Sequence, residues 1–175
     1  MSRSRIAQLI CVVAPLLIAA LGTARPSLAE VEKVDCQQGD FFLDGGQACN
    51  FPLFIHSEGG ENRVCGEFYD KNDNLVRTFS AGKGYMLTLT NKATGATLTA
   101  PANGSNAHTR YNADGSTTTV ATGHNLIILF PTDIPKGPST VLYRGQVVYT
   151  VDLNGVWTLT KVTGNSTDIC AALSD

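Results

Sequence analysis

Short runs of β-branched and aromatic residues, separated by turn signals, recur along this chain from Phe51 onward. Such runs suit a pleated, half-buried surface, and the Asn, Asp and Gly residues between them tolerate the positive φ of tight turns. Beyond the first 29 residues no window has helical periodicity, and residues 168–173 form at most one helical turn. The expected strands are residues 51–57, 64–70, 75–80, 85–90, 96–100, 106–112, 117–122, 126–131, 139–144, 146–152 and 156–162.

Alternation within these runs predicts sheets with one dry face and one wet face. Tyr85, Leu87 and Leu89 share one side of their strand, with threonine on the reverse side. The run 126–131 is apolar on both faces and is the candidate for a central strand. These patterns predict an all-β domain, built as an antiparallel two-sheet sandwich. A partly closed β-barrel is the alternative that the sequence leaves open.

The first 29 residues have the form of an export signal. Arg3 and Arg5 precede an apolar run over 6–21, and Ser27-Leu28-Ala29 offers small residues where a signal peptidase cuts. We therefore expect cleavage before Glu30 and a secreted, extracellular protein, with a signal anchor as the alternative. No later apolar run approaches the ~18 residues of a membrane helix, so no membrane span is expected after cleavage.

Removal of the signal peptide at 1–29 leaves enough chain for one domain with its own core. We expect an irregular N-terminal arm over 30–48 and a single β domain over 49–175. Three of the 13 basic residues lie in the leader, so ten remain against all 15 acidic residues and give a formal charge of −5. This acidic balance argues against nucleic acid as a partner.

Four cysteines follow the leader, which itself contains Cys11. An even number in an exported chain indicates two disulfides, and three pairings are possible. We favour Cys49–Cys170, because Cys49 precedes the first strong strand and Cys170 follows the last, which leaves Cys36–Cys65. Free buried thiols are the alternative, and the absence of a Cys-x-x-Cys pair argues against a zinc site.

Five residues are candidates for ligand binding. His108 and Arg110 alternate along one face of a strand, beside Tyr111, and mixtures of cation and aromatic often form glycan or anion sites. His124 and Asn125 follow a glycine just before the most apolar strand, where they either fix a ligand or cap a loop. A two-residue turn at 114–115 would set His108 opposite Ala121 and keep the two histidines several positions apart. The alternative is an ordinary solvated face.

The sequence contains no recognisable catalytic set. A Gly-x-Ser-x-Gly elbow is absent, and a thiol nucleophile conflicts with an oxidised cysteine set. Glu67 is the only glutamate within an expected strand, so no carboxylate pair stands out. The segment from Asp70 resembles a calcium loop but has Leu75 and Ala81 where glycine and glutamate are required. We therefore predict no metal and no cofactor.

Several short segments resemble a group of small secreted β-rich proteins of actinobacteria to which no activity is assigned. The segments lie between Cys49 and Leu173, and the resemblance implies an exported β domain but brings no catalytic residue. The matching residues are 48–53, 89–91, 93–95, 116–118, 123–125, 148–151 and 168–173.

These features together predict an extracellular or cell-surface binding protein, with a glycan or another cell-surface component as its partner. A small polysaccharide-active hydrolase or lyase that uses acids such as Glu67 is the first alternative. A structural envelope component is the second. Asn103 and Asn165 begin N-glycosylation triplets, which matter only in a eukaryotic host.

Overall fold

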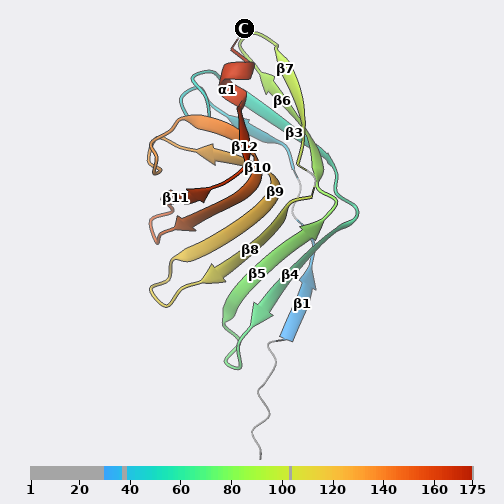
Figure 1. Cartoon of the computed structure of the whole chain (residues 1–175), viewed down its shortest axis with the longest axis vertical. Coiled ribbons are helices and arrows are strands. Elements are labelled where there is room, and N and C mark those ends of the chain that lie inside the picture. The colour runs from blue at the N-terminus through green and yellow to red at the C-terminus, as the bar shows by residue number, and fades with distance from the viewer. Residues whose placement is uncertain (1–29, 37–38, 103, 175) are drawn as a thin grey trace, which may run out of the picture.

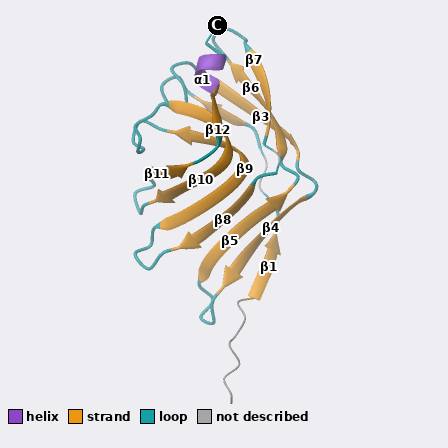
Figure 2. Cartoon of the chain, in the orientation of Figure 1, coloured by secondary structure: helices purple, strands orange, loops and turns teal. Residues whose placement is uncertain are grey.

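The computed structural model describes residues 30–36, 39–102 and 104–174. These residues form two antiparallel sheets and one short helix, and neither sheet closes on itself (Figure 1, Figure 2). The predicted two-sheet, all-β architecture is therefore confirmed. The expected signal peptide over 1–29 and the glycosylation triplet at Asn103 begin outside the described residues.

The larger sheet has the order β1-β4-β5-β8-β9-β10-β11, with β12 also paired to β10, and the smaller sheet has the order β2-β3-β6-β7. The helix α1 (Ile169–Ala172) begins after Asp168, whose side chain accepts a hydrogen bond from the Ala171 N–H. The strands are β1 (Glu30–Val34), β2 (Phe41–Leu43), β3 (Leu53–Gly59), β4 (Arg63–Tyr69), β5 (Leu75–Gly82), β6 (Tyr85–Asn91), β7 (Thr97–Pro101), β8 (Asn106–Tyr111), β9 (Thr117–Leu129), β10 (Ser139–Val151), β11 (Trp157–Val162) and β12 (Asn165–Asp168).

The expectation of an irregular arm over 30–48 is wrong at two places, because β1 and β2 belong to the two sheets. β1 pairs with β4 along its whole length, and β2 pairs with β3. The two arm strands are edge strands, and they pair the outer backbone donors and acceptors of β4 and β3. Backbone pairing of this kind leaves little trace in side-chain patterns, which explains why the arm seemed irregular.

The long strands β9 and β10 each join two runs that the sequence separated at a glycine. Gly123 and Gly145 lie opposite each other in the pairing of the two strands. A Cβ on Gly123, whose φ is 87°, would lie 2.1 Å from the backbone oxygen of Gly104. Only glycine fits there, so it lets the hairpin bend while both strands continue (Figure 1). The expected separate loop at 123–125 is therefore wrong, since these residues lie within β9.

The bent hairpin is apolar on both faces beyond Gly123, as predicted for the run 126–131. Leu126 and Ile128 pack towards the smaller sheet and α1, in a cluster that includes the fully buried Leu53 and Leu89. Ile127 and its neighbours pack on the reverse face, in a second cluster. The second cluster contains Ile127, Leu129 and Val147, with Tyr143, Tyr149, Trp157 and Leu159 against them.

Both disulfides join the cysteines in the pairing that the sequence favoured. Cys49 and Cys170, with Cα atoms 5.5 Å apart, fasten the start of the smaller sheet to α1 inside the first cluster. Cys36 and Cys65, with Cα atoms 5.3 Å apart, fasten the segment after β1 to β4. One bridge thus lies in the core and the other lies at the edge of the larger sheet.

The larger sheet has a covered half and an open half. The covered half consists of residues 124–129 of β9 and the residues 139–144 of β10 that pair with them, together with β12 and α1. The open half is β1, β4, β5 and β8, and within its strands β4, β5 and β8, which are fully described, only Gly66 is buried. Both faces of the open half therefore reach solvent, and we name them the Glu67 face and the Arg77 face after one residue on each.

Candidate functional site

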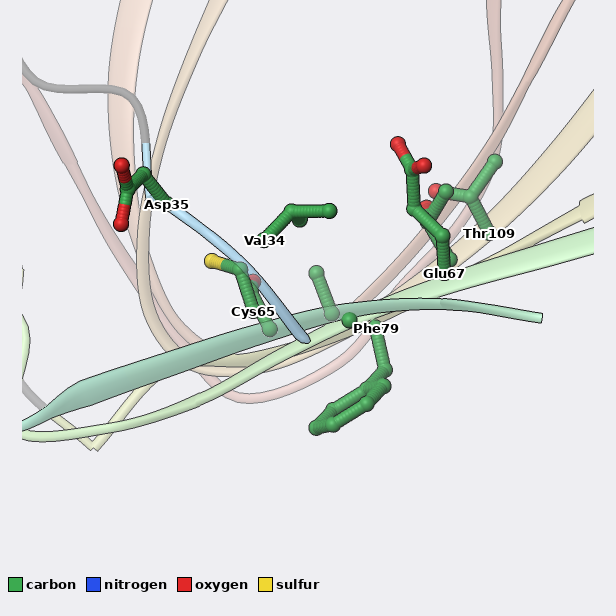
Figure 3. A pocket seen from close by; sticks show the side chains of 10 residues that line it. Val34, Asp35, Cys65, Glu67, Phe79 and Thr109 are labelled. Carbon is green, nitrogen blue, oxygen red and sulfur yellow. The ribbon is translucent and has the colours of Figure 1, made fainter. Parts of the chain in front are cut away.

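A hollow of ≈ 380 Å³ lies on the Glu67 face of the open half. Its floor follows from strand register, since Glu67 of β4 lies opposite Thr78 of β5, and Thr78 lies opposite Thr109 of β8. Figure 3 shows Glu67 and Thr109 on the same side of the ribbon, with the ring of Phe79 on the other side. The hollow is lined by Val34, Asp35, Cys65, Gly66, Glu67, Thr78, Phe79, Ser80, Ala107 and Thr109.

The end of β1 forms one wall of this hollow. Val34 lies opposite Cys65 in the strand pairing, and the Cys36–Cys65 disulfide holds the following residues over the sheet. This position places Asp35 at the opposite end of the hollow from Glu67, as Figure 3 shows. A disulfide therefore fixes one of the two carboxyl groups that line the site.

The other carboxyl group is oriented by a neighbouring tyrosine. The Tyr69 hydroxyl donates a hydrogen bond of 2.5 Å to Glu67 Oε2. This bond, followed by partial desolvation and the negative charges of Glu67 and Glu32, raises the pKa of Tyr69 to about 12. The phenol therefore keeps its proton at neutral pH and holds the carboxylate in one orientation.

Hydroxyl groups supply most of the remaining polar lining. Thr109 Oγ1 and Thr119 Oγ1 share a hydrogen bond of 2.8 Å on this face. Ser80 Oγ accepts a hydrogen bond of 2.9 Å from Arg63, but no basic side chain lines the hollow itself. The hollow is thus rich in hydroxyls and carboxylates, which suits a ligand with many hydrogen-bonding groups and no negative charge.

Glu67 is not the only glutamate on a strand, contrary to the sequence interpretation. Glu32 of β1 lies directly opposite Glu67. Two like charges at opposed positions destabilise a sheet when nothing compensates them. The additional carboxylate went unrecognised because β1 lies in the segment that was expected to be irregular.

The five candidate ligand residues do not form one site. His108 and Arg110 are exposed on the Arg77 face, whereas Tyr111, 42% exposed, lies on the Glu67 face beyond the threonine floor. His124 pairs with Arg144, and Asn125 pairs with Tyr143, both inside β9. His108 and Arg110 share one face as expected, whereas alternation sends Tyr111 to the other face. A ligand role for the five residues stays a prediction.

The register between β8 and β9 differs by one residue from the expected one. His108 lies opposite Val120, because the turn is a three-residue loop in which Asn112 N–H donates to Ser116 O over 2.8 Å. Gly115, with φ of 83°, occupies the left-handed position of this loop. His108 and His124 nevertheless remain four residues apart in register, as predicted.

Asn125 is the one side chain of the five with an unsatisfied buried group. Its Nδ2 has no hydrogen-bond partner among the described residues, and it lies on the same face as Ile127.

The segment from Asp70, which resembled a calcium loop in sequence, is a hydrogen-bonded turn. Asp70 Oδ1 accepts bonds from Asn72 N–H and Asn74 N–H, and these bonds with the Asn74 side chain lower the pKa of Asp70.

Among the described residues, no group of three or more His, Cys, Asp or Glu side chains is placed to hold a metal ion. No helix in the described part of the chain is long and apolar enough to cross a membrane.

No family model matches the chain, and the searches of curated proteins and of solved structures found no match. The site must therefore be interpreted from its own geometry.

Proposed function

We propose that this is a secreted binding protein whose hollow on the Glu67 face takes an uncharged, polyhydroxylated ligand such as a saccharide chain. The observation that carries the proposal is the composition of the hollow, in which Thr78, Ser80 and Thr109 hydroxyls lie between two carboxyl groups. The open shape across three strands suits a chain that lies on the sheet.

The chemistry of a sugar matches that of the lining. Threonine and serine hydroxyls both donate and accept hydrogen bonds, and a carboxylate accepts from neighbouring sugar hydroxyls. Each such bond contributes only about 0.5–1.5 kcal/mol, so several are needed for useful affinity. The Tyr69 bond to Glu67 reduces the ordering that the ligand must impose on that carboxylate. Tyr111 at the end of the floor offers a ring for a sugar to stack on.

Two disulfides are compatible with a protein that works outside the cell. The leader-like sequence over 1–29 and the resemblance to secreted actinobacterial proteins support the same location. A disulfide-bonded β domain that presents an open hollow is also a simple arrangement for passive binding. We therefore propose binding at the cell surface or in the medium as its role.

The test is a binding screen of the purified protein on uncharged glycans and cell-wall polysaccharides. Thr78→Tyr fills the floor of the hollow with a residue that still favours a strand, and we expect it to abolish retention. Glu61→Gln is the matched control, because this exposed residue lies outside the hollow in the turn between β3 and β4. Retention that survives Thr78→Tyr, with the fold verified by circular dichroism, would overturn the proposal.

Hydrolysis of a polysaccharide is the second candidate, because Glu67 and Asp35 both line the hollow. Glycosidases place one carboxyl group on each side of the bond that they cut. Product release is therefore followed in the same wells as binding. Release of reducing ends that Glu67→Gln abolishes would replace the binding proposal with an enzymatic one.

A further inference from the structure

Two arginines lie directly opposite each other on the Arg77 face. Arg77 of β5 pairs with Arg110 of β8, and both side chains are exposed. Their Cα positions belong to neighbouring hydrogen-bonded strands, which run about 4.8 Å apart. Like charges at opposed positions destabilise a sheet, and an anion bound between the two side chains would relieve this repulsion.

Aromatic contacts hold part of this pair in place. The Arg77 guanidinium lies over the Phe68 ring, with Cζ 4.3 Å from the ring centroid. Phe68 contacts Phe79 at 5.7 Å between centroids, and Phe79 stacks on His108 at 6.4 Å with 22° between the ring planes. A guanidinium that contacts a ring has less freedom to lose when it binds a ligand. These contacts therefore preorganise the Arg77 guanidinium beside the second cation, Arg110.

No acid neutralises this face. The described strands β4, β5 and β8 carry no Asp or Glu on the Arg77 face, and neither arginine forms an ion pair within the described residues. Asp70 and Asp114 lie in the two adjoining turns, and each accepts hydrogen bonds from residues of its own turn. The Ser116 hydroxyl and N–H lower the pKa of Asp114, as the Asn74 amide does for Asp70.

We propose that the Arg77 face binds the carboxylate groups of an acidic polysaccharide, that is, a chain of uronate sugars. A guanidinium presents a planar fork that matches a carboxylate, and two adjacent forks match two carboxylates or one shared between them. The half-exposed rings of Phe68 and Phe79 give the sugar rings an apolar surface beside the charges.

A uronate chain fits this face better than nucleic acid does. The described part of the face offers Arg77, Arg110, His108 and the exposed Lys33 of β1, which lies opposite Gly66, and this is a small cluster for the dense charge of a polyphosphate backbone. The acids of the adjoining turns oppose any anionic polymer. The preference for a uronate chain therefore rests on the planar forks and the rings beside them, which match a carboxylate carried on a sugar ring.

This surface is separate from the hollow, because alternate residues of the same strands supply the two. Thr78 and Thr109 point to the Glu67 face, whereas Arg77 and Arg110 point to the Arg77 face. One sheet would thus hold an uncharged chain on one side and an acidic chain on the other. Failure of one site leaves the other intact, so the two proposals are tested independently.

The test measures binding of the purified protein to polygalacturonate by affinity electrophoresis, with dextran as the uncharged polymer. Arg77→Glu with Arg110→Glu removes both forks, and we expect affinity to fall about tenfold or more. Lys92→Glu with Lys136→Glu changes the net charge equally at two exposed positions away from this face, and we expect affinity close to that of the parent protein. Binding of the parent protein should also weaken as salt rises.

A second double variant keeps the proposal testable if charge reversal prevents folding. Arg77→Lys with Arg110→Lys preserves the charge and loses the planar fork, so we expect an intermediate weakening of about threefold. Equal losses in the arginine and lysine charge reversals would overturn the proposal, because they indicate unspecific attraction. Tighter binding to an oligonucleotide than to polygalacturonate would overturn it as well, since it indicates the wrong class of polymer.

Discussion

The covered and open halves of the larger sheet are made of similar strands but use their side chains differently. In the covered half, Leu142, Ile169 and Leu173 are at most 2% exposed and share one core with the smaller sheet. In the open half, only Gly66 of β4, β5 and β8 is buried. The difference teaches that this protein confines its buried core to one half of the sheet and leaves the other half with two solvent-exposed faces, which are the surfaces that we propose for ligand binding.

The open half remains a sheet without a core of its own for identifiable reasons. Each of its inner strands has backbone partners on both sides, and the Cys36–Cys65 disulfide fastens its edge. The hairpins β4–β5, β8–β9 and β10–β11 of the larger sheet end in turns of one kind, in which a single residue adopts a left-handed conformation. Asp73, Gly115 and Gly155 occupy this position in the three three-residue loops.

Removal of each disulfide tests the comparison with the largest expected effect. The Cys49–Cys170 bond spans 121 residues and the Cys36–Cys65 bond spans 29. The chain-entropy model gives losses in the free energy of unfolding of about 5 and about 3.5 kcal/mol for the two double Cys→Ser variants. Urea denaturation of both measures this difference. A larger loss for the edge bridge would show that the open half carries more of the stability than its burial indicates.

Truncation of one apolar side chain in each half gives a sharper contrast. Leu142→Ala opens a cavity in the core that the two sheets share, and we expect a loss of about 3 kcal/mol. Val64→Ala removes a side chain that is 47% exposed in the open half, and we expect a loss of about 0.5 kcal/mol or less. Similar losses, measured by urea denaturation, would contradict the division into two halves.

Alkaline pH tests the open half through Tyr69, and comparison with a Tyr69 variant separates this effect from that of Tyr143 and Tyr149 on β10, whose pKa values burial also raises. Its pKa is raised from 10.0 to about 12, chiefly by the bond to Glu67, so the folded state favours the protonated phenol. This contribution to stability is complete below pH 10 and is lost as the pH rises towards 12. We expect Tyr69→Phe to lessen the fall in urea midpoint over this range. Tyr111→Phe is the control, and an equal effect from it would contradict the role of the Glu67 bond.

The smallest expected effect concerns the left-handed position of the turns. Asp73, with φ of 61°, is the single described residue other than glycine with positive φ. We expect Asp73→Gly to raise the free energy of unfolding by no more than about 0.5 kcal/mol, because relief of strain is partly offset by unfolded-state entropy. Gly155→Ala at the equivalent position has open space for its Cβ, so a loss of about 1 kcal/mol there measures the backbone conformation alone.

Much of the fold could be predicted from local patterns. Alternation at Tyr85, Leu87 and Leu89 identified an inner face of the smaller sheet, and Leu87 and Leu89 are buried as expected. The same reasoning failed at Gly123, where a residue typical of turns bends a continuous strand. It failed there because glycine is required by the close approach of the Gly104 backbone. Gly104 belongs to another segment of the chain, so the sequence around Gly123 does not reveal this contact.

The candidate site was less predictable, because it depends on pairing between distant strands. Arg110 was recognised from its own strand, but its partner Arg77 was not, since β6 and β7 intervene between β5 and β8 and belong to the other sheet. Thr78 and Thr109 meet through the same pairing. Glu67 was identified because it stands out as an acid within an apolar strand, which is a local signal.

The Cys49–Cys170 bond has a consequence for the order of events during synthesis. Cys49 can react only after residue 170 has emerged, and by then every strand of both sheets has already left the ribosome. The covered half therefore cannot be locked covalently while the chain is still in transit. The native bond can therefore close only around a polypeptide whose last strand has already been made.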